Sequence, residues 1–274
     1  MDRPLIMGVV NVTPDSFSDG GQHTDHRSAI AHALRLREEG ADILDIGGES
    51  TRPGSDAVSP QEELRRIMPV IEGLVDRDIP ISVDTRRPEV MSRAVAAGVA
   101  MINDVQGFRD PRSFEVAAAS PCGLCIMHML GDPRTMQVAP SYTDVVTEVE
   151  SFLVSQRDAF LKQGVARERL LIDPGFGFGK TRDHNLALMR ALPRLAAHQM
   201  VLVGVSRKSM IGALMAAAGE RSDVAGTDTP GPSGRLSGSL AAAIWASSHG
   251  AAVLRVHDVR DTVGALRVWR ALES

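Results

Sequence analysis

The fold class predicted by the sequence of 274 residues is α/β, a single-domain (β/α)8 barrel of the TIM type, and two observations lead to it. Short apolar runs alternate eight times with longer segments of helical period, which indicates a parallel sheet whose strands are linked through helices. The apolar runs are almost continuous, as in strands that are covered on both faces. The structural alternative is an open, doubly wound sheet, but a closed barrel is the common form of eight such units.

The predicted strands are distributed along the whole chain, so one core is sufficient. They are Leu5–Val10, Ile43–Ile46, Ile79–Val83, Ala100–Ile102, Leu124–Met127, Leu170–Ile172, Val201–Val205 and Ala252–Val256.

The helix predicted after the second strand has the clearest signals. Ser59 precedes Pro60 at the first helical position, and Glu62 is placed to complete a capping box. One apolar stripe then faces the core, formed by Leu64, Ile67, Ile71, Leu74 and Val75. Other predicted helices end at a glycine, where a left-handed cap is favoured: Gly40, Gly98 and Gly164.

We expect the barrel to include residues 1–274 as one domain, because α/β barrels commonly have about 250 residues. The segment Gly219–Gly234 is rich in Gly, Pro, Ser, Thr and Asp, and it predicts an exposed loop within the seventh unit. Leu236–Leu254 has no residue charged at neutral pH, but polar residues interrupt it. It predicts a small-residue helix, a stop at Gly250 and a strand, rather than a membrane span.

Composition argues against several classes of protein. The net charge of −4 and the pI of about 6.1 are not those of a protein that neutralises many nucleic-acid phosphates. Two cysteines, Cys122 and Cys125, are too few for a secreted disulfide scaffold, and their lone CxxC spacing predicts structural thiols away from the barrel mouth. The N-terminal residues show no signal-peptide pattern, so we expect a cytoplasmic protein with no membrane or nucleic-acid partner.

Polar residues follow the predicted strands at the ends where a barrel of this class carries its chemistry. They are Asn11, Glu49, Thr51, Arg52, Asp84, Asn103, His128, Asp173, Arg207, Lys208, Arg255 and His257. Polar groups that converge on one mouth are costly to desolvate unless they satisfy a ligand or one another. We interpret Asp45 and Glu49 as caps of loop amides and leave them out of the site.

The remaining set divides by chemistry. Asp84, Asn103 and Asp173 offer acceptors for a flat heterocycle with several N–H donors. Cationic or potentially cationic side chains suit an anion such as diphosphate: Arg52, Lys208, Arg255 and His257. The sequence therefore predicts a pocket for a nitrogen-rich ring that carries a phosphate tail.

Motifs along nearly the whole chain resemble those of the dihydropteroate synthases. They are GVVNVTPDSFSDGG (8–21), DIGGESTRPG (45–54), SVDT (82–85), IND (102–104), MHMLGDPRTMQ (127–137), DPGFGFGKT (173–181), GVSRKSMIG (204–212), RLSGSLA (235–241) and RVHDV (255–259). Each is moderately informative alone, and together in this order they are highly specific. The resemblance implies an enzyme that condenses (7,8-dihydropterin-6-yl)methyl diphosphate with 4-aminobenzoate, giving 7,8-dihydropteroate and diphosphate for folate biosynthesis.

The resemblance also implies residue roles. It places the pterin at Asp84, Asn103, Met127, Asp173, Phe178 and Lys208, and the diphosphate at Asn11, Thr51, Arg255 and His257, with Arg52 beside them. The catalytic cations would be Lys208, Arg255, His257 and Arg52. The 4-aminobenzoate would contact Phe17, Pro53 and Ser209. Asn11 would help to hold Mg2+ on the diphosphate, which needs few protein ligands, and the family implies a homodimer.

Other interpretations remain at this point. A methyltetrahydrofolate–corrinoid methyltransferase uses a similar barrel, but it needs no diphosphate site, so Asn11, Arg255, His257 and the SRKS segment (206–209) argue against it. A pterin-binding paralogue without synthase activity would keep the same motifs. The run from Gly175 to Thr181 is no nucleotide loop, because a Walker A motif needs glycine where Pro174 stands.

Overall fold

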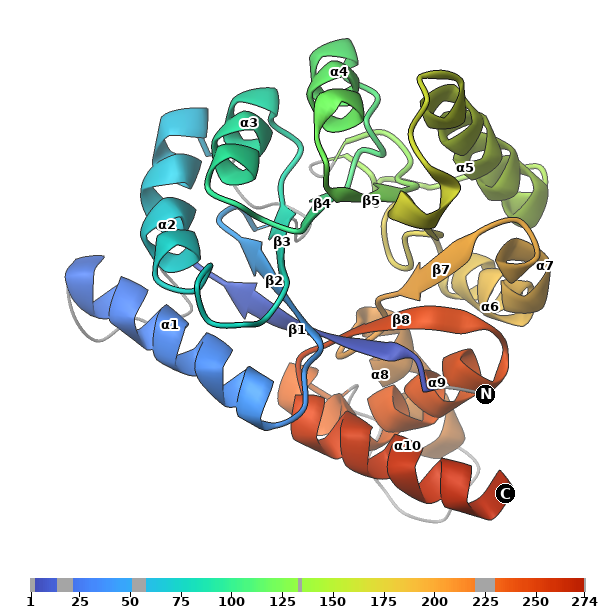
Figure 1. Ribbon diagram of the computed structural model, residues 1–274. Coiled ribbons are helices and arrows are strands. Elements are labelled where there is room, and N and C mark those ends of the chain that lie inside the picture. The colour runs from blue at the N-terminus through green and yellow to red at the C-terminus, as the bar shows by residue number, and fades with distance from the viewer. Residues whose placement is uncertain (1–2, 14–21, 51–57, 133–134, 220–229, 274) are drawn as a thin grey trace.

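Eight parallel strands pair in sequence order and close on themselves, β8 against β1, in the computed structural model of the chain (Figure 1). The structure describes residues 3–13, 22–50, 58–132, 135–219 and 230–273. The strands are β1 (Leu5–Asn11), β2 (Ile43–Gly47), β3 (Ile81–Asp84), β4 (Met101–Asp104), β5 (Gly123–Met127), β6 (Leu170–Asp173), β7 (Met200–Val203) and β8 (Ala251–Val256). The predicted barrel is confirmed, and the open sheet is excluded by the β1–β8 pairing.

Helices follow the strands and form a ring outside the barrel (Figure 1). They are α1 (Gln22–Glu38), α2 (Pro60–Glu72), α3 (Pro88–Ala96), α4 (Pro111–Ala119), α5 (Val145–Lys162), α6 (Arg182–Arg190), α7 (Leu192–Ala196), α8 (Ser209–Gly219), α9 (Leu236–Ser248) and α10 (Val259–Glu273), with short 3-10 helices η2 (Arg167–Arg169) and η3 (Pro232–Arg235). The glycines expected to end helices have the left-handed conformation, with φ of 105° at Gly40, 95° at Gly98 and 83° at Gly164.

Helix α2 confirms the predicted stripe and corrects the predicted cap. Ile67 and Ile71 of α2 are buried, as is Leu74 two residues after its end, and Ser59 Oγ accepts a hydrogen bond from Glu62 N at 3.1 Å. The expected capping box is wrong in its second half, because the Glu62 carboxylate accepts from Arg65 and Arg66 instead. Two guanidinium partners on the same helix offer a carboxylate stronger, charge-assisted bonds than one backbone amide.

The region around the seventh unit differs in part from the expected loop at Gly219–Gly234. Gly219 still belongs to α8, and Pro232–Arg235 form η3, while residues 220–229 lie outside the described residues. The small-residue helix, the stop at Gly250 (φ 95°) and the strand after it are confirmed as α9 and β8. No helix within the described ranges is long and apolar enough to cross a membrane.

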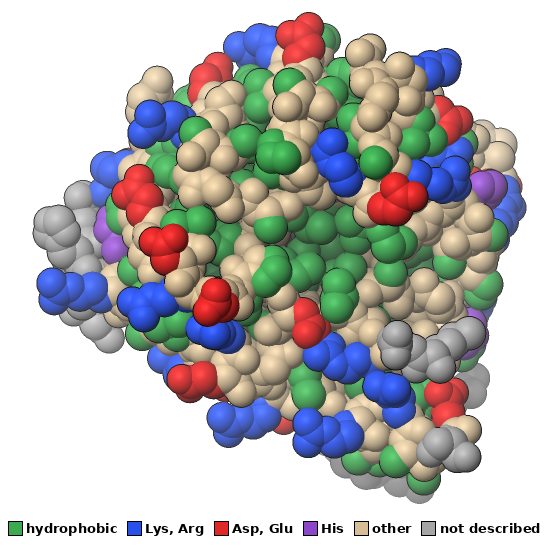
Figure 2. Space-filling view, in the orientation of Figure 1, with side chains coloured by type: hydrophobic (Ala, Val, Ile, Leu, Met, Phe, Trp, Pro, Cys, Tyr) green, Lys and Arg blue, Asp and Glu red, His purple; other side chains and the backbone are tan. Residues whose placement is uncertain are grey.

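The core has an outer layer between strands and helices and a small layer inside the barrel. The inner layer is Met7, Ile43, Met101, Cys125, Leu171, Leu202 and Val253. Cys122 and Cys125 are buried free thiols, as expected, and Cys122 donates to the carbonyl of Val99. The face seen in Figure 1 has apolar side chains at its centre, with Lys, Arg, Asp and Glu interspersed around them (Figure 2).

Candidate functional site

The site begins one layer above the apolar residues inside the barrel. Side chains of a strand point to the same face at every second residue. Two residues after the inner-layer positions Ile43, Met101, Cys125, Leu171 and Val253, the next inward side chains are polar or contain sulfur. They are Asp45, Asn103, Met127, Asp173 and Arg255. In the sheet, Asp84 is beside Asn103 and Met127 is beside Asp173. Of the strand-end residues predicted to meet at one mouth, the structure brings Asp84, Asn103, Asp173 and Arg255 together in this layer.

Arg255 is the centre of this layer. Its Nε donates to Asp45 Oδ2 at 2.6 Å, and its Nη2 donates to Asp84 Oδ2 at 2.8 Å. Burial alone would lower the pKa of Arg255, but the attraction of Asp45 and Asp84 outweighs it and raises that pKa. For Asp84, burial is the larger effect and raises the pKa to about 7, even though Arg255 opposes it.

Asp45 is fully buried, and the expectation that it caps loop amides is wrong. Its Oδ2 also accepts from Asn103 Nδ2 at 3.2 Å, and among the described residues Asp45 Oδ1 and Asn103 Oδ1 have no hydrogen-bond partner. The sequence signal that could have revealed Asp45 is an acidic residue inside a strand that is otherwise wholly apolar. Such a charge requires a partner when it is buried.

Lys208 lies beside the proposed ring site. It follows Arg207, which has a φ of 59°, and its Nζ is 4.4 Å from the centroid of the Phe178 ring and donates to the carbonyl of Phe176. Burial lowers the pKa of Lys208 to about 8, against the attraction of Asp173. Phe178 in turn packs on a buried cluster that contains Met127.

Asp173 connects the end of β6 to the glycine-rich loop that follows. Its Oδ1 accepts from Gly175 N at 2.7 Å. Gly175 has a φ of 68°, and a Cβ there would lie 1.9 Å from the carbonyl oxygen of His128. Burial raises the pKa of Asp173. The glycine is thus required for the close approach of this loop to the chain after β5.

Lys180 is a buried cation within the glycine-rich motif that the sequence does not mark as a site residue. Its Nζ is 3.0 Å from His128 Nδ1 and donates to the carbonyls of Gly175 (3.0 Å), Phe178 (3.1 Å) and His128 (3.3 Å). Burial lowers the pKa of Lys180 to about 7 and, together with Lys180, lowers the pKa of His128 to about 3. His128 therefore supports the loop as a neutral ring.

The other predicted residues lie around this centre or outside the described part of the chain. His257 is half-buried at the end of β8, where its Nδ1 is 3.1 Å from Ser206 Oγ, and burial lowers its pKa to about 4. Asn11 ends β1 half-buried, and Ser209 is exposed at the start of α8. Four predicted residues lie outside the described residues: Phe17, Thr51, Arg52 and Pro53.

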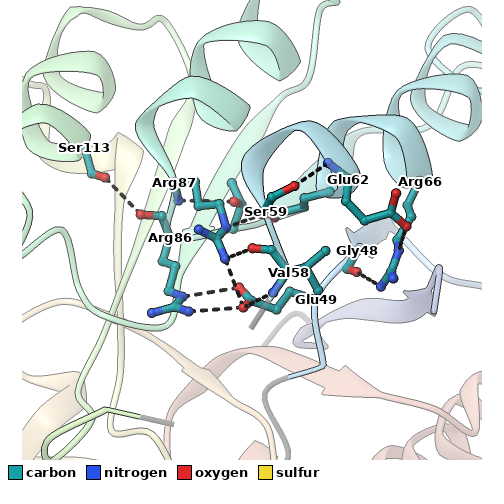
Figure 3. A network of polar contacts seen from close by, with 11 residues as sticks. Gly48, Glu49, Val58, Ser59, Glu62, Arg66, Arg86, Arg87 and Ser113 are labelled. Carbon is teal, nitrogen blue, oxygen red and sulfur yellow. Dashed lines mark hydrogen bonds and ion pairs between the residues drawn. The ribbon is translucent and has the colours of Figure 1, made fainter. Parts of the chain in front are cut away.

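Glu49 belongs to a second polar network beside the mouth (Figure 3). Its carboxylate is 3.1 Å from both Arg86 Nη2 and Arg87 Nη2, and its Oε1 also accepts from Val58 N at 3.3 Å. The interpretation of Glu49 as a loop cap holds for the Val58 amide, but the arginines are its stronger partners. Because Arg87 also donates to the carbonyl of Val58, this network connects the backbone at Val58 to the side chain of Glu49.

No group of three or more His, Cys, Asp or Glu side chains suited to a metal occurs among the described residues. A hard cation such as Mg2+ keeps water and phosphate oxygens as ligands, so one amide oxygen from Asn11 is compatible with it.

Comparison with known proteins gives a consistent result. The model of a family described as pterin binding enzyme matches residues 7–257. The dihydropteroate synthase of Escherichia coli strain K12 is 46% identical over 100% of this chain and 93% of that protein, and the one from Mycobacterium leprae is 42% identical over 96% and 91%.

Solved structures agree. A Xanthomonas albilineans dihydropteroate synthase with 4-aminobenzoic acid has a TM-score of 0.89 at 53% identity, covering 100% of this chain and 94% of that one. The same enzyme in complex with 7,8-dihydropteroate has a TM-score of 0.85 at 50% identity, covering 100% and 95%. A Yersinia pestis dihydropteroate synthase with a sulfonamide drug complex has a TM-score of 0.88 at 43% identity, covering 99% and 94%.

Proposed function

The chain belongs to the dihydropteroate synthases, a family of pterin-binding enzymes, and from this premise we propose how the barrel mouth performs the reaction. The enzyme joins the methylene carbon of (7,8-dihydropterin-6-yl)methyl diphosphate to the amine of 4-aminobenzoate and releases diphosphate. The observation that carries our assignment of roles is the buried layer in which Asp84, Asn103 and Arg255 meet around Asp45. This layer combines hydrogen-bond acceptors for the pterin ring with a cation for the diphosphate tail.

The pterin is held by the acceptors of this layer. The carboxylates of Asp84 and Asp173 accept N–H bonds from the ring edges, and Asn103 offers its unpartnered Oδ1. Lys208 donates from the side of the loop, while Met127 and Phe178 contact the flat ring. The support is geometric: Phe178 packs on the Met127 cluster, and Lys208 Nζ lies over Phe178.

The diphosphate is held by cations and donors at the rim. Arg255 lies in β8, His257 directly follows that strand, and Lys208 follows the neighbouring strand β7. With Thr51 and Arg52, these groups stabilise the negative charge that develops on the departing diphosphate, which is the interaction that accelerates such a step. His257 acts as a neutral donor, because burial lowers its pKa to about 4.

Mg2+ is the cofactor that we propose, held by Asn11 and the diphosphate oxygens. When bound, it supplies Lewis-acid stabilisation of the leaving group. Asn11 ends β1 at the mouth, where an uncharged oxygen ligand suits a cation that retains most of its water.

In the reaction, the bond between the methylene carbon and the bridging oxygen breaks, and its electron pair leaves with the diphosphate. The electron-rich dihydropterin stabilises the cationic character left on the methylene. The amine of 4-aminobenzoate, placed by Phe17, Pro53 and Ser209, donates its lone pair to form the C–N bond and then loses a proton. No nucleophilic side chain is required.

The decisive experiment measures diphosphate release from the pterin diphosphate with Mg2+, with and without 4-aminobenzoate. We expect release coupled to the appearance of 7,8-dihydropteroate, and loss of both when Mg2+ is chelated. Pterin binding without turnover would instead identify a non-catalytic paralogue. Turnover that persists in the chelator would contradict the proposed cofactor.

We also propose that the enzyme is a cytoplasmic homodimer. An apolar groove of about 410 Å3 between α6, α8 and α9 supports a second copy as partner. It is lined by Met189, Ile211, Leu214, Ala241 and Trp245, among others, and Trp245 is 43% exposed. Exposed apolar patches of this kind mark interaction sites.

A further inference from the structure

We propose that Asp45 is a positioning residue that sets the hydrogen-bonding pattern of the site through both Arg255 and Asn103. The inference deepens the proposed function and rests on it. Asp45 would contact neither substrate, because its side chain is fully buried beneath the mouth. Its effect passes through the two side chains that it holds.

The first contact fixes the guanidinium. Arg255 has two acidic partners, but they differ in position: the Asp45 side chain is 0% exposed, whereas that of Asp84 is 15% exposed. A ring that donates N–H bonds to Asp84 competes with Arg255 for that carboxylate. Asp45 is the partner that no ligand reaches, so it retains Nε at 2.6 Å and leaves the Nη groups available to an anion.

The second contact fixes an amide. An ionised carboxylate only accepts hydrogen bonds, so Asn103 must turn its NH2 group toward Asp45 Oδ2, at 3.2 Å. The carbonyl oxygen of Asn103 is then left without a partner in the described structure. A buried acceptor without a partner is unfavourable until a donor arrives. Asp45 thereby makes Asn103 an acceptor and selects a ligand that carries N–H groups.

The charge of Asp45 is necessary for both effects. Asparagine has nearly the same shape, but it can donate as well as accept, so Asn103 would no longer be held in one orientation. The negative charge of the Asp45 carboxylate also neutralises the positive charge of the buried Arg255 guanidinium. Removing one charge of such a pair leaves the other buried without a counter-charge. Asp45→Asn therefore tests the chemistry at almost unchanged volume.

The test is a double-mutant cycle that compares Asp45→Asn, Arg255→Ala and the double variant with the unmodified enzyme. For each protein, Kd is measured for the pterin alcohol and for its diphosphate, with thermal unfolding to verify the fold. We expect Asp45→Asn to weaken binding of the diphosphate about tenfold more than binding of the alcohol in the unmodified enzyme, and this excess to fall below about threefold when Arg255 is absent. An equal excess in the two backgrounds would refute action through Arg255.

The same cycle with Asn103→Ala tests the amide. Asp45→Asn should weaken binding of the pterin alcohol about tenfold in the unmodified enzyme and leave the Asn103→Ala background nearly unchanged. Ser82→Ala is the matched control, because Ser82 is fully buried and pairs with Asp45 in the β2–β3 register, and its hydroxyl has no hydrogen-bond partner within the described part of the chain. It should leave both affinities unchanged. An equal effect of Ser82→Ala would show that any change in this layer impairs binding.

A second variant covers the case in which Asp45→Asn does not fold. Arg255→Lys keeps the charge but lacks the fork that allows Nε and the Nη groups to donate at the same time. With Asp45 intact, we expect about tenfold weaker binding of the diphosphate; unchanged affinity would overturn the proposal. If the unmodified enzyme neither binds nor converts the pterin diphosphate, the proposed function itself fails, which is a separate outcome.

Discussion

At the scale of single residues, the mouth contains buried carboxyl groups that receive few hydrogen bonds from the protein itself. Asp173 is 6% exposed, and the structure gives its Oδ1 one hydrogen bond, from Gly175 N. We expect Asp173→Ala to weaken pterin binding by about 1–3 kcal/mol, because donors of the buried ring lose their acceptor. Calorimetric titration with the pterin alcohol measures this loss.

The control for that substitution is Asp183→Ala, which removes the same group from the exposed first turn of α6. It should leave the affinity unchanged. If Asp173→Ala binds the pterin alcohol as tightly as the unmodified enzyme does, Asp173 is not part of the ring site.

Two titrating residues, Asp84 and Lys208, determine the pH dependence of kcat/KM that we expect for the enzyme. Burial raises the pKa of Asp84 to about 7 and lowers the pKa of Lys208 to about 8. Below the first value Asp84 is protonated and accepts ring donors poorly, and above the second Lys208 loses its charge. We therefore expect kcat/KM to fall on both sides of the interval between them.

Lys208→Arg distinguishes this assignment from titration of the substrates, because arginine keeps its proton throughout the accessible range. The substituted enzyme should keep the acid limb of the kcat/KM profile and lose the alkaline limb, even if its maximum is lower. An alkaline limb at the same pH in both proteins would assign it to a group other than Lys208.

The residues of the site differ in how far the sequence reveals them. Asn11, Asp84, Asn103 and Asp173 each stand at the end of an apolar run, so the rule for barrel mouths is sufficient to find them. Asp45 is 210 positions from Arg255, and their contact depends on the closure of the barrel. The apolar strand around Asp45 marks it as a buried charge, but no local pattern identifies Arg255 as its partner, so this pairing appears only in the structure.

At the scale of elements, the loop after β6 is organised around Lys180. Its ammonium donates to three carbonyls, two of which belong to the loop that carries Phe178. We expect Lys180→Met to lower the free energy of unfolding by about 1–3 kcal/mol, because carbonyls lose their donor. It should also raise the Kd for the pterin alcohol, because Phe178 loses its support.

Arg182→Met provides the comparison, since Arg182 is exposed two residues further along the same segment. Chemical denaturation and pterin titration of both variants separate the two effects. A Lys180→Met enzyme that is destabilised but binds the pterin normally would show that the loop keeps its shape without the ammonium.

Local signals predict where elements begin and end better than they predict which side chains pair. Pro60 and Ser59 correctly mark the start of α2, but Glu62 bonds to the arginines of its own helix. The reciprocal box is found instead at α6, between Thr181 and His184. Competing partners one turn away decide such cases, and their side-chain geometry is not encoded in the motif.

At the scale of the whole molecule, the alternation of strands and helices is sufficient to predict the barrel. When β8 pairs with β1, no strand of the sheet is left with an unpaired edge, and this favours the closed barrel over an open sheet. The same pattern does not predict how copies of the chain assemble. The apolar groove between α6, α8 and α9 becomes visible only when three helices lie side by side.

That groove gives the last prediction, on assembly. We expect the unmodified enzyme to sediment at twice its chain mass of 29.3 kDa. Ala241→Glu, on the exposed face of α9 within the groove, should give monomers, because a charge enclosed between two apolar surfaces is costly to desolvate. Analytical ultracentrifugation over a range of concentrations measures the shift.

Leu272→Glu is the matched control, because Leu272 is 78% exposed on α10 and does not line the groove. It adds the same charge and should leave the dimer intact. Dissociation by Leu272→Glu alone would place the interface at α10, and a monomeric unmodified enzyme would contradict the dimer itself. Because the groove lies outside the barrel, we expect monomeric Ala241→Glu to retain pterin binding, so assembly and catalysis can be measured separately.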